Sequence, residues 1–473
     1  MTTETIPQTE IIYGQKKIED KLLFLLPVMA LVIDIFTPIL MQYGLLPSIA
    51  RYLSDLAVAA MLGLVVLYVL AYDYFPKTVL IIVAITLLWI PIAVINGESP
   101  LASVWGWWSI FKYPFAGLFI YLYPGWPKGI ARSLPKYLVI LMGLQVIIQT
   151  GQYLSGLPIG DAIGGTLSSD GGVAKLLMIT ILTLDLALGS WLAKGEWKLL
   201  IWVFGLGIIS STLAENKLFA VSIVIMTLAT MAIYLLRGER LRRMWSLFFT
   251  SMVVFIGFIS LYNLYAAEIG GAARIETYYL NPQALDNYLN LRVRGSSGDY
   301  NLGRNFALMY GWDTIKHDPV TMLFGLGMGS RSESSSLGVV GQGLSSSYYG
   351  LSTGSSLTVF LQEFGIVGLS LGMILVLWLT FRLYRDAARH PQSELNTLRY
   401  GLLLFSLFWP VWLWYASVWV MRAPMLLYWM LLGYIFNREI AAYFDKQQPE
   451  KTEPASARYS KITTVEPESE PFA

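Results

Sequence analysis

Charged residues in a mostly apolar chain are its best candidates for chemistry. Glu215, Asn216 and Lys217 form a short polar stretch between two apolar segments, and Lys217 opens the second segment. A helix N-terminus attracts anions and disfavours a lysine, so we interpret Lys217 as a residue that holds an anion. The alternative is a lysine that snorkels to a membrane interface.

Several arginines follow in a long polar stretch between about residues 266 and 354. They are Arg274, Arg292, Arg294, Arg304 and Arg331. Together with Lys217 they would line a cationic cavity, and a guanidinium matches phosphate oxygens with bidentate geometry. Each arginine taken alone is equally suited to solvent or to a lipid headgroup.

The same stretch contains the glycine-rich sequence GLGMGS, with Gly325, Gly327 and Gly329 at alternate positions. Glycines allow a backbone to approach an anion closely and to point N–H groups at it. No Walker lysine accompanies them, so nucleotide binding is not indicated. A flexible solvated loop is the alternative.

Residue types that the chain lacks exclude several kinds of site. There is no cysteine, and His317 and His390 are the only histidines. Thiolate chemistry and multi-histidine metal sites are therefore excluded, and we predict neither a metal nor a cofactor. The net charge of +2 argues against nucleic acid as a partner.

Composition places these residues in a membrane protein. Apolar residues make up 55% of the 473 positions and charged residues 14%, against roughly 25% charged in soluble domains. A bilayer core needs about 20 apolar residues per helix. We predict an all-α polytopic bundle of about twelve spans: 22–42, 53–72, 76–95, 103–123, 134–150, 173–193, 197–213, 217–236, 244–265, 355–381, 400–416 and 420–437.

Basic residues in the short loops predict the orientation. With the N-terminus inside, the inner loops hold fourteen Lys and Arg and the outer loops three, as the positive-inside rule requires. We therefore expect both termini in the cytoplasm. The expected divisions are a tail at 1–21, spans one to nine at 22–265, one large external loop at 266–354, the last three spans at 355–437, and a mostly disordered tail at 438–473.

Order is expected inside the large loop. From Arg304 to Lys316, apolar Phe306, Met309, Trp312 and Ile315 recur every three residues. This spacing predicts an amphipathic helix on the membrane or the bundle. Within the spans, Asp34, Lys112 and Asp185 must face a cavity or pair with other groups.

Three motifs in this order resemble the O-antigen ligase/polymerase superfamily, which includes Wzy-type polysaccharide polymerases. The first is LAENKLFAVSI at 213–223. The second lies in the loop and consists of GRNFALMYGWDTIKHDP at 303–319 followed by GLGMGS. The third is QEFGIVGL at 362–369. The resemblance implies a GT-C-like, metal-independent glycosyltransferase of the bacterial inner membrane. Its donor would be an undecaprenyl-pyrophosphate-linked oligosaccharide, polymerised into O-antigen, capsule or exopolysaccharide on the outer face. A chain-length regulator and a flippase of the same pathway are the implied protein partners.

The resemblance also implies roles for residues. Lys217 and Arg304 would stabilise the leaving pyrophosphate, with Arg292, Arg294 and Arg331 as further ligands and Gly325 to Ser330 as backbone donors. Candidates for a base are His317, Glu363, Asp299 and Glu333. Glu363 could instead cap backbone groups at the start of its span.

Two other functions remain open. Ligases of the superfamily carry a histidine about nine residues before the glutamate, where this chain has Gly354 and Ser355; this favours a polymerase over transfer to another acceptor. A transporter or flippase would explain the polar residues in the spans, but not a loop of this size on one face.

Overall fold

The structure is a computed structural model and consists almost entirely of helices. It describes residues 8–72, 77–123, 126–157, 160, 162–167, 172–238, 241–269, 274–294, 300–334, 338–342, 355–418 and 421–446. The tail predicted at 1–21 enters α1 from residue 8, and most of the predicted disordered C-terminal tail lies outside the described residues.

Helices of the first half of the chain follow the predicted spans. They are α1 (Gln8–Gln42), η1 (Ser48–Tyr52), α2 (Leu53–Tyr72), α3 (Lys77–Leu87), α4 (Trp89–Ile95), α5 (Pro100–Leu122), α6 (Ile130–Leu154), η2 (Gly165–Leu167), α7 (Gly172–Lys194), α8 (Trp197–Leu213), α9 (Leu218–Leu236) and α10 (Leu241–Ile269). The predicted third span is divided into α3 and α4 at Leu88.

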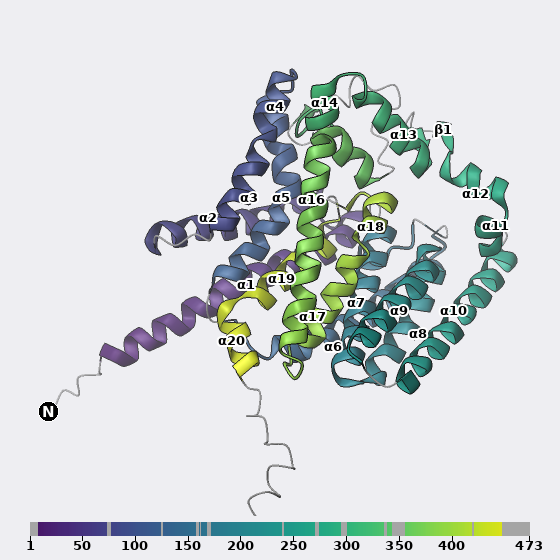
Figure 1. Cartoon of the computed structure of the whole chain (residues 1–473), viewed down its shortest axis with the longest axis horizontal. Coiled ribbons are helices and arrows are strands. Elements are labelled where there is room, and N and C mark those ends of the chain that lie inside the picture. Colours follow the sequence, from purple (N-terminus) through teal and green to yellow (C-terminus); the bar gives the residue numbers. More distant parts are fainter. Residues whose placement is uncertain are drawn as a thin grey trace, which may run out of the picture.

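The large loop is ordered wherever it is described. It forms α11 (Ile275–Leu280), α12 (Pro282–Leu289), β1 (Arg292–Arg294), β2 (Tyr300–Leu302), α13 (Arg304–Ile315), α14 (Pro319–Phe324), β3 (Glu333–Ser334) and β4 (Val339–Val340). The strands pair as two antiparallel hairpins, β1 with β2 and β3 with β4. Figure 1 shows α11 and α12 continuing from the upper end of α10 toward β1 and α13.

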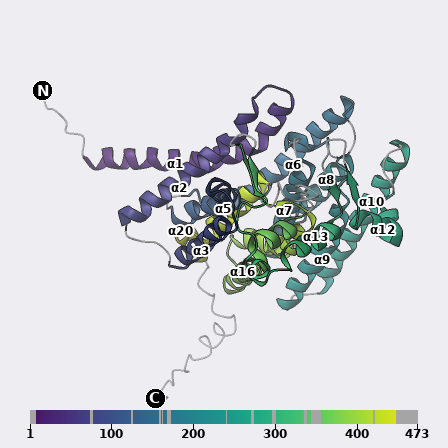
Figure 2. The same cartoon turned by 90° about the horizontal axis from the view of Figure 1, so that it is seen from above.

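The chain then returns through α16 (Ser356–Arg389), α17 (Asn396–Leu407), α18 (Trp409–Tyr415), α19 (Arg422–Phe436) and α20 (Arg438–Lys446). Seen from above, α1 and α2 lie at one edge of the molecule and α10 and α12 at the opposite edge (Figure 2).

Among the described residues, seven helices are long and apolar enough to cross a membrane. All twelve predicted segments contain helix, and seven of them correspond to these candidates. The segments at 76–95, 197–213 and 420–437 contain shorter apolar helices, α5 at 103–123 is not among the seven, and the segment at 400–416 is divided into α17 and α18 at Phe408. Large apolar side chains point outward from these helices: Leu70, Ile147 and Val253 are each at least 70% exposed. Such surfaces fit hydrocarbon rather than water, so the chain is a multi-pass membrane protein.

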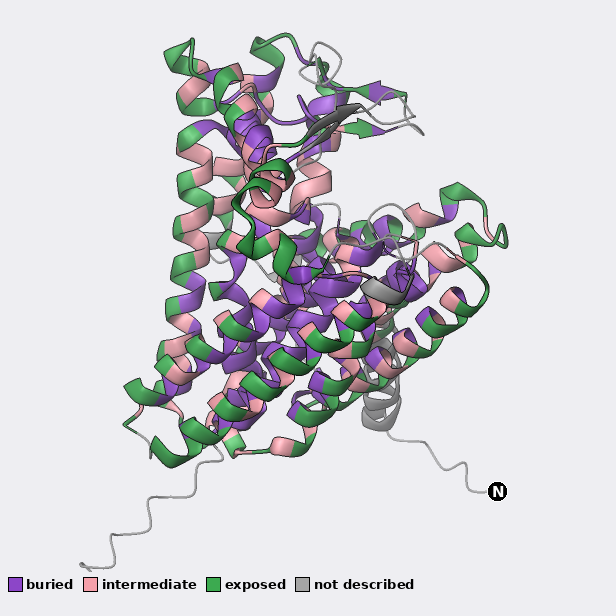
Figure 3. Ribbon diagram, turned by 90° about the vertical axis from the view of Figure 1, so that its right-hand side faces the viewer, coloured by how far each residue is buried: buried purple, intermediate pink, exposed green. Residues whose placement is uncertain are grey.

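The core lies around α7, whose side chains are buried nearly throughout (Figure 3). Small residues let the inner helices approach. A Cβ on Gly189 would lie 2.4 Å from the Thr397 carbonyl oxygen of α17, and one on Gly433 would lie 2.1 Å from that of Gly117. Lipid tails are as apolar as the helices, so hydrophobic attraction does not hold membrane helices together. Close packing at small residues such as glycine does so instead.

Helix α13 matches its predicted limits within one residue, and its buried face matches the prediction in part. Phe306 and Ile315 are buried as predicted, together with Ala307 and Gly311, whereas Met309 and Trp312 are exposed. Buried positions four residues apart follow the helical period of 3.6, and a stripe every third residue drifts around the helix. Gly311 faces α16, because a Cβ there would meet the Thr358 side chain at 2.7 Å.

Helix α16 bends sharply at Gly365, whose φ of 62° and ψ of −167° are not helical. The bend separates a short segment at 356–364 from the long membrane helix at 366–389. Ser355 caps the short segment by accepting a hydrogen bond from the Thr358 amide. Its first residue also binds the turn after α18, since Ser356 Oγ donates to the Ala416 carbonyl.

Candidate functional site

Lys217 lies in a tight turn between α8 and α9, as predicted, and occupies the position before the first residue of α9. Glu215 has a positive φ of 51°, which reverses the chain within three residues. Asn216 is buried and donates a hydrogen bond to the Val173 carbonyl of α7 at 3.4 Å. The turn is therefore fixed to the core rather than free in solvent.

Aromatic rings surround the Lys217 ammonium. Its Nζ lies 4.5 Å from the ring centre of Tyr278 in α11 and 5.7 Å from that of Tyr262 in α10. The Glu215 carboxylate is 4.0 Å away. Tyr279 donates a hydrogen bond to the Lys217 carbonyl at 3.4 Å. Helix α11 of the large loop thus lies over the N-terminal end of α9.

Arg304, the first residue of α13, is held by two hydrogen bonds. Its Nε donates to the Tyr415 carbonyl at 3.0 Å, and its Nη1 donates to the Tyr288 hydroxyl at 3.0 Å. The guanidinium carbon also lies 4.3 Å from the ring centre of Tyr415. These contacts fix a positive charge between the loop and the α18–α19 turn.

Tyr278 and Tyr288 connect the two cations, because their rings meet edge to face with centres 5.8 Å apart. Lys217 and Arg304, 87 positions apart in the sequence, therefore share one tyrosine-lined cluster. We call it the tyrosine site, and its members are Lys217, Glu215, Arg304, Tyr262, Tyr278, Tyr288 and Tyr415.

Two features suit the tyrosine site to a polar ligand. Burial, together with the nearby Glu215 carboxylate, raises the pKa of Tyr278, so its phenol stays neutral and able to donate at neutral pH. The buried hydroxyl of Tyr262 has no hydrogen-bond partner among the described residues. Buried polar groups normally have a partner, and an unpaired one points to a missing ligand or water.

The glycine-rich loop has a different environment. Its amides donate within the protein: Gly325 to Thr321, Gly327 to Glu363, and Met328 to Trp89. The glycines serve close approach, since a Cβ on Gly327 would lie 2.2 Å from Ala93 of α4 and one on Gly329 would lie 2.2 Å from the Ala102 carbonyl oxygen of α5. The predicted backbone donors therefore fasten the loop to the membrane helices.

Glu363 organises this loop from the short segment of α16. The residue is 1% exposed, and its Oε1 accepts the Arg331 amide at 2.9 Å. Its carbonyl accepts the Gly327 amide at 3.1 Å. These contacts match the capping alternative for Glu363 rather than a base in the tyrosine site.

Arg331 is buried beside Glu363, not at the tyrosine site. Burial lowers the pKa of its guanidinium, and the neighbouring Tyr310 and Glu363 oppose that shift. Tyr310 stacks on Phe306, one turn before it on α13. Arg331 thus faces the middle of α13, whereas Arg304 begins that helix.

The remaining predicted residues lie outside the tyrosine site or have no described side chain. His317 is exposed beyond the C-terminal end of α13, a helix about 18 Å long that begins at Arg304. Glu333 is exposed on β3. Arg292 and Arg294 form β1, but their side chains lie outside the described residues, as does Asp299 entirely. In the described part of the chain, no three potential ligand side chains come together for a metal.

Charges inside the spans are paired in one case and single in another. Lys112 Nζ lies 2.6 Å from Asp55 Oδ1, and Arg422 lies 3.1 Å from Asp55 Oδ2, so α2, α5 and α19 are joined by ion pairs. Asp34 is buried beside this group. Asp185 is fully buried in α7, and its carboxylate has no hydrogen-bond partner among the described residues.

The tyrosines are what sequence reasoning missed. They lie in three separate regions, α10, α11–α12 and α18, and only the fold brings them together. The run Tyr278-Tyr279 beside an arginine-rich loop was the available signal. No known protein family matches this chain, and no curated protein matches it.

Proposed function

We propose that this protein transfers a glycan from a lipid-linked pyrophosphate donor to a hydroxyl acceptor at the outer face of a bacterial inner membrane. The observation that carries the proposal is the meeting of Lys217 and Arg304 in one tyrosine-lined site at the ends of membrane helices. The proposed donor is an undecaprenyl-pyrophosphate-linked oligosaccharide. The proposed acceptor is a second lipid-linked repeat unit, so the product is a longer polysaccharide.

The reaction needs stabilisation of negative charge. The bond between the anomeric carbon and the pyrophosphate oxygen breaks, and the acceptor oxygen forms a new bond to that carbon. Both electrons of the broken bond remain with the leaving lipid pyrophosphate. Lys217 and Arg304 stabilise this charge, and because their partners already hold them in place, little reorganisation accompanies the step.

Glu215 is the carboxylate within the tyrosine site and replaces Glu363 and His317 as our candidate base. It lies 4.0 Å from Lys217, and its side chain is 25% exposed, so an acceptor can reach it. In the proposed reaction it accepts the proton of the acceptor hydroxyl. Neutral tyrosine hydroxyls bind sugar hydroxyls around it.

The proposed topology is the one that the basic loops predict: about twelve spans in a GT-C-like bundle, both termini in the cytoplasm, and the tyrosine site outside. No metal takes part in the proposed step, since Lys217 and Arg304 supply the positive charge that stabilises the leaving pyrophosphate. Segments that are far apart in the sequence and are predicted to lie on the outer side contact one another, as Arg304 contacts the carbonyl of Tyr415 at the end of α18. Such contacts support a single site at that face.

A strain lacking the gene and complemented with variants tests the proposal. Lys217→Ala and Arg304→Ala should each abolish long polymer, and lipid-linked single repeat units should accumulate. Lys316→Ala is the matched control, because Lys316 is exposed at the far end of α13 and pairs with Asp313. Wild-type polymer in both site variants would contradict the proposal. Accumulation of substrate on the inner face instead would indicate a flippase.

A further inference from the structure

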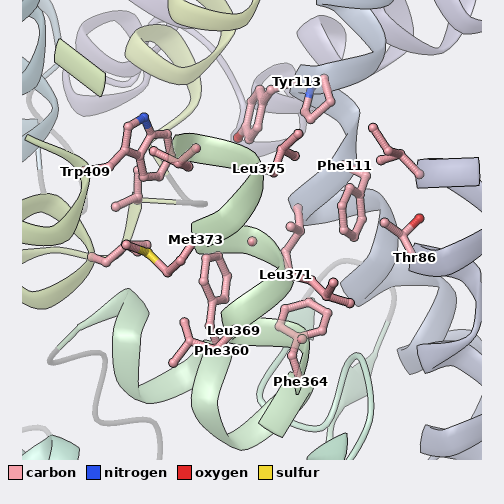
Figure 4. A pocket seen from close by; sticks show the side chains of 18 of the residues that line it. Thr86, Phe111, Tyr113, Phe360, Phe364, Leu369, Leu371, Met373, Leu375 and Trp409 are labelled. Carbon is pink, nitrogen blue, oxygen red and sulfur yellow. The ribbon is translucent and has the colours of Figure 1, made fainter. Parts of the chain in front are cut away.

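An apolar pocket of about 290 Å³ opens among α3, α4, α5, α16, α18 and α19. Its lining is hydrocarbon and aromatic rings, with Thr86 the one aliphatic polar side chain in it (Figure 4). Phe111 and Tyr113 come from α5, Phe360 and Phe364 from α16, and Trp409 from α18. Such a lining gives no means of fixing a polar ligand but binds a hydrocarbon one.

Of the two glycines of α16 in the lining, Gly368 is packed, since an added Cβ would lie 2.9 Å from the Trp89 ring, whereas Gly372 borders open space. Gly368 and Gly372 lie one helical turn apart and both line the pocket. Small residues at this spacing usually let a neighbouring membrane helix approach. At Gly372 no helix does so, because an added Cβ would meet nothing within 4 Å. The space beside Gly372 is therefore open to a ligand.

The pocket approaches the tyrosine site through the end of α18, although none of the residues of that site lines the pocket. Phe360 and Phe364 lie in the short α16 segment that also carries Glu363. Val418 lines the pocket and lies three residues after Tyr415, the last residue of α18, whose carbonyl binds Arg304. Trp89 fastens this region from the other side by donating to the Phe324 carbonyl at 2.9 Å. A lipid bound at Arg304 by its charged group would therefore have this apolar space near it, on the segment from Tyr415 to Val418.

We propose that this pocket binds the hydrocarbon chain of a polyprenyl lipid. The inference rests on the proposed function, since it assigns the pocket to the chain of the same lipid-linked substrate. Its rings offer broad surfaces on which the branched methyl groups of an isoprenoid gain dispersion contacts. A straight phospholipid acyl chain is the competing occupant.

Binding measured without any transfer tests the inference. The full chain is purified into nanodiscs of defined phospholipid, and the affinities for undecaprenyl phosphate and farnesyl phosphate are compared. Wild-type protein should bind the longer chain at least about tenfold more tightly. Gly372→Phe fills the pocket and should remove most of that preference, whereas binding of farnesyl phosphate should change little.

Gly257→Phe on α10 is the matched control, because a Cβ there also meets nothing within 4 Å. It should keep the preference of the wild type. Ile110→Trp fills the pocket from α5 and replaces Gly372→Phe if that variant does not fold. Equal binding of the two lipids by wild-type protein, or an unchanged preference in a folded filled variant, would overturn the inference. The inference would also be overturned if excess phospholipid displaced bound undecaprenyl phosphate as readily as excess undecaprenyl phosphate does.

The two proposals fail in different ways. If wild-type protein transfers glycan but a filled variant keeps the chain-length preference, the pocket assignment is wrong and the function stands. If the pocket shows the expected preference but no transfer occurs, the lipid site stands and the function is wrong.

Discussion

Tyr288 shows how one side chain can set the position of a cation. Its hydroxyl accepts from Arg304 at 3.0 Å, and its ring contacts Tyr278, which covers Lys217. Tyr288→Phe keeps the ring and removes the hydrogen bond, which at a charged group contributes about 1.5–3 kcal/mol. We expect transfer to slow about tenfold or more in a polymerisation assay. Tyr137→Phe, on an exposed part of α6, should behave as wild type; an equal loss in both variants would contradict this role.

Glu363 is expected to act on stability through the glycine-rich loop. Glu363→Ala leaves the Arg331 amide without its acceptor and should lower the free energy of unfolding by about 1–3 kcal/mol. Thermal unfolding in detergent measures this effect. Glu333→Ala removes an exposed carboxylate of the same loop and should unfold as wild type. If Glu363→Ala abolished transfer with an unchanged Tm, Glu363 would instead be part of the chemistry.

Glu215 carries the proton in the proposed step. Glu215→Gln keeps the size of the side chain and removes the base, so we expect slower transfer by about 10²-fold or more, with donor binding retained. Single-turnover rates with preloaded donor separate the two effects. A rate equal to wild type would remove Glu215 from the mechanism.

Residue type identified part of the site from the sequence. Lys217 stood out because a lysine at a helix N-terminus opposes the helix dipole, and Arg304 was selected from the loop arginines only through the resemblance. The tyrosines did not stand out, since the chain has twenty-eight and such rings collect at membrane interfaces for reasons of solvation alone. Glu363 was a candidate base with backbone capping as the alternative, and only the packing of the loop distinguishes an acceptor for amides from a base.

At the scale of elements, the glycine-rich loop locks the large loop onto α4 and α5. Gly327 combines a φ of +95° with an added Cβ only 2.2 Å from Ala93, whereas Gly338 has a φ of +63° and open space. Gly327→Ala should therefore lower the Tm and polymer yield well below those of Gly338→Ala, which carries the backbone strain alone. Equal Tm values for the two would show that the loop does not depend on this contact.

Hydropathy predicted helices at all twelve segments because a membrane helix must be apolar along its whole length. It did not predict the division of the third segment at Leu88 or the bend at Gly365, where a single glycine ends one helix and begins another. The face of α13 was predicted only in part: Phe306 and Ile315 are buried as expected, but a search for large apolar residues overlooks Ala307 and Gly311, which are buried too. Gly311 faces α16.

At the scale of the whole molecule, contacts sort the connections into two groups. Predicted outer connections touch one another, as Glu98 does with Gln342 and Arg304 with Tyr415. Predicted inner connections do the same, as Arg132 does with Glu394 and Tyr434 with Pro127. In the proposed topology the second group lies in the cytoplasm, because the basic residues gather in those loops.

Reporter fusions measure that assignment. A fusion after Pro391 should report the cytoplasm, and one after Ser334 should report the outer side. Alkaline phosphatase and a fluorescent protein used in parallel give opposite signals at each position and control for expression. A cytoplasmic Ser334 would place the tyrosine site on the wrong face for a lipid-linked donor.

Reconstitution tests the central claim most directly. Purified wild-type protein and the Lys217→Ala, Arg304→Ala and Lys316→Ala variants are supplied with lipid-linked oligosaccharide in liposomes, and the products are resolved by mass spectrometry. We predict longer lipid-linked glycans from wild type and Lys316→Ala, in the presence of EDTA as well, with rates lower by about 10²–10³ in the two site variants. Glycans that stay at one repeat unit with folded wild-type protein, or full rates in both site variants, would contradict it.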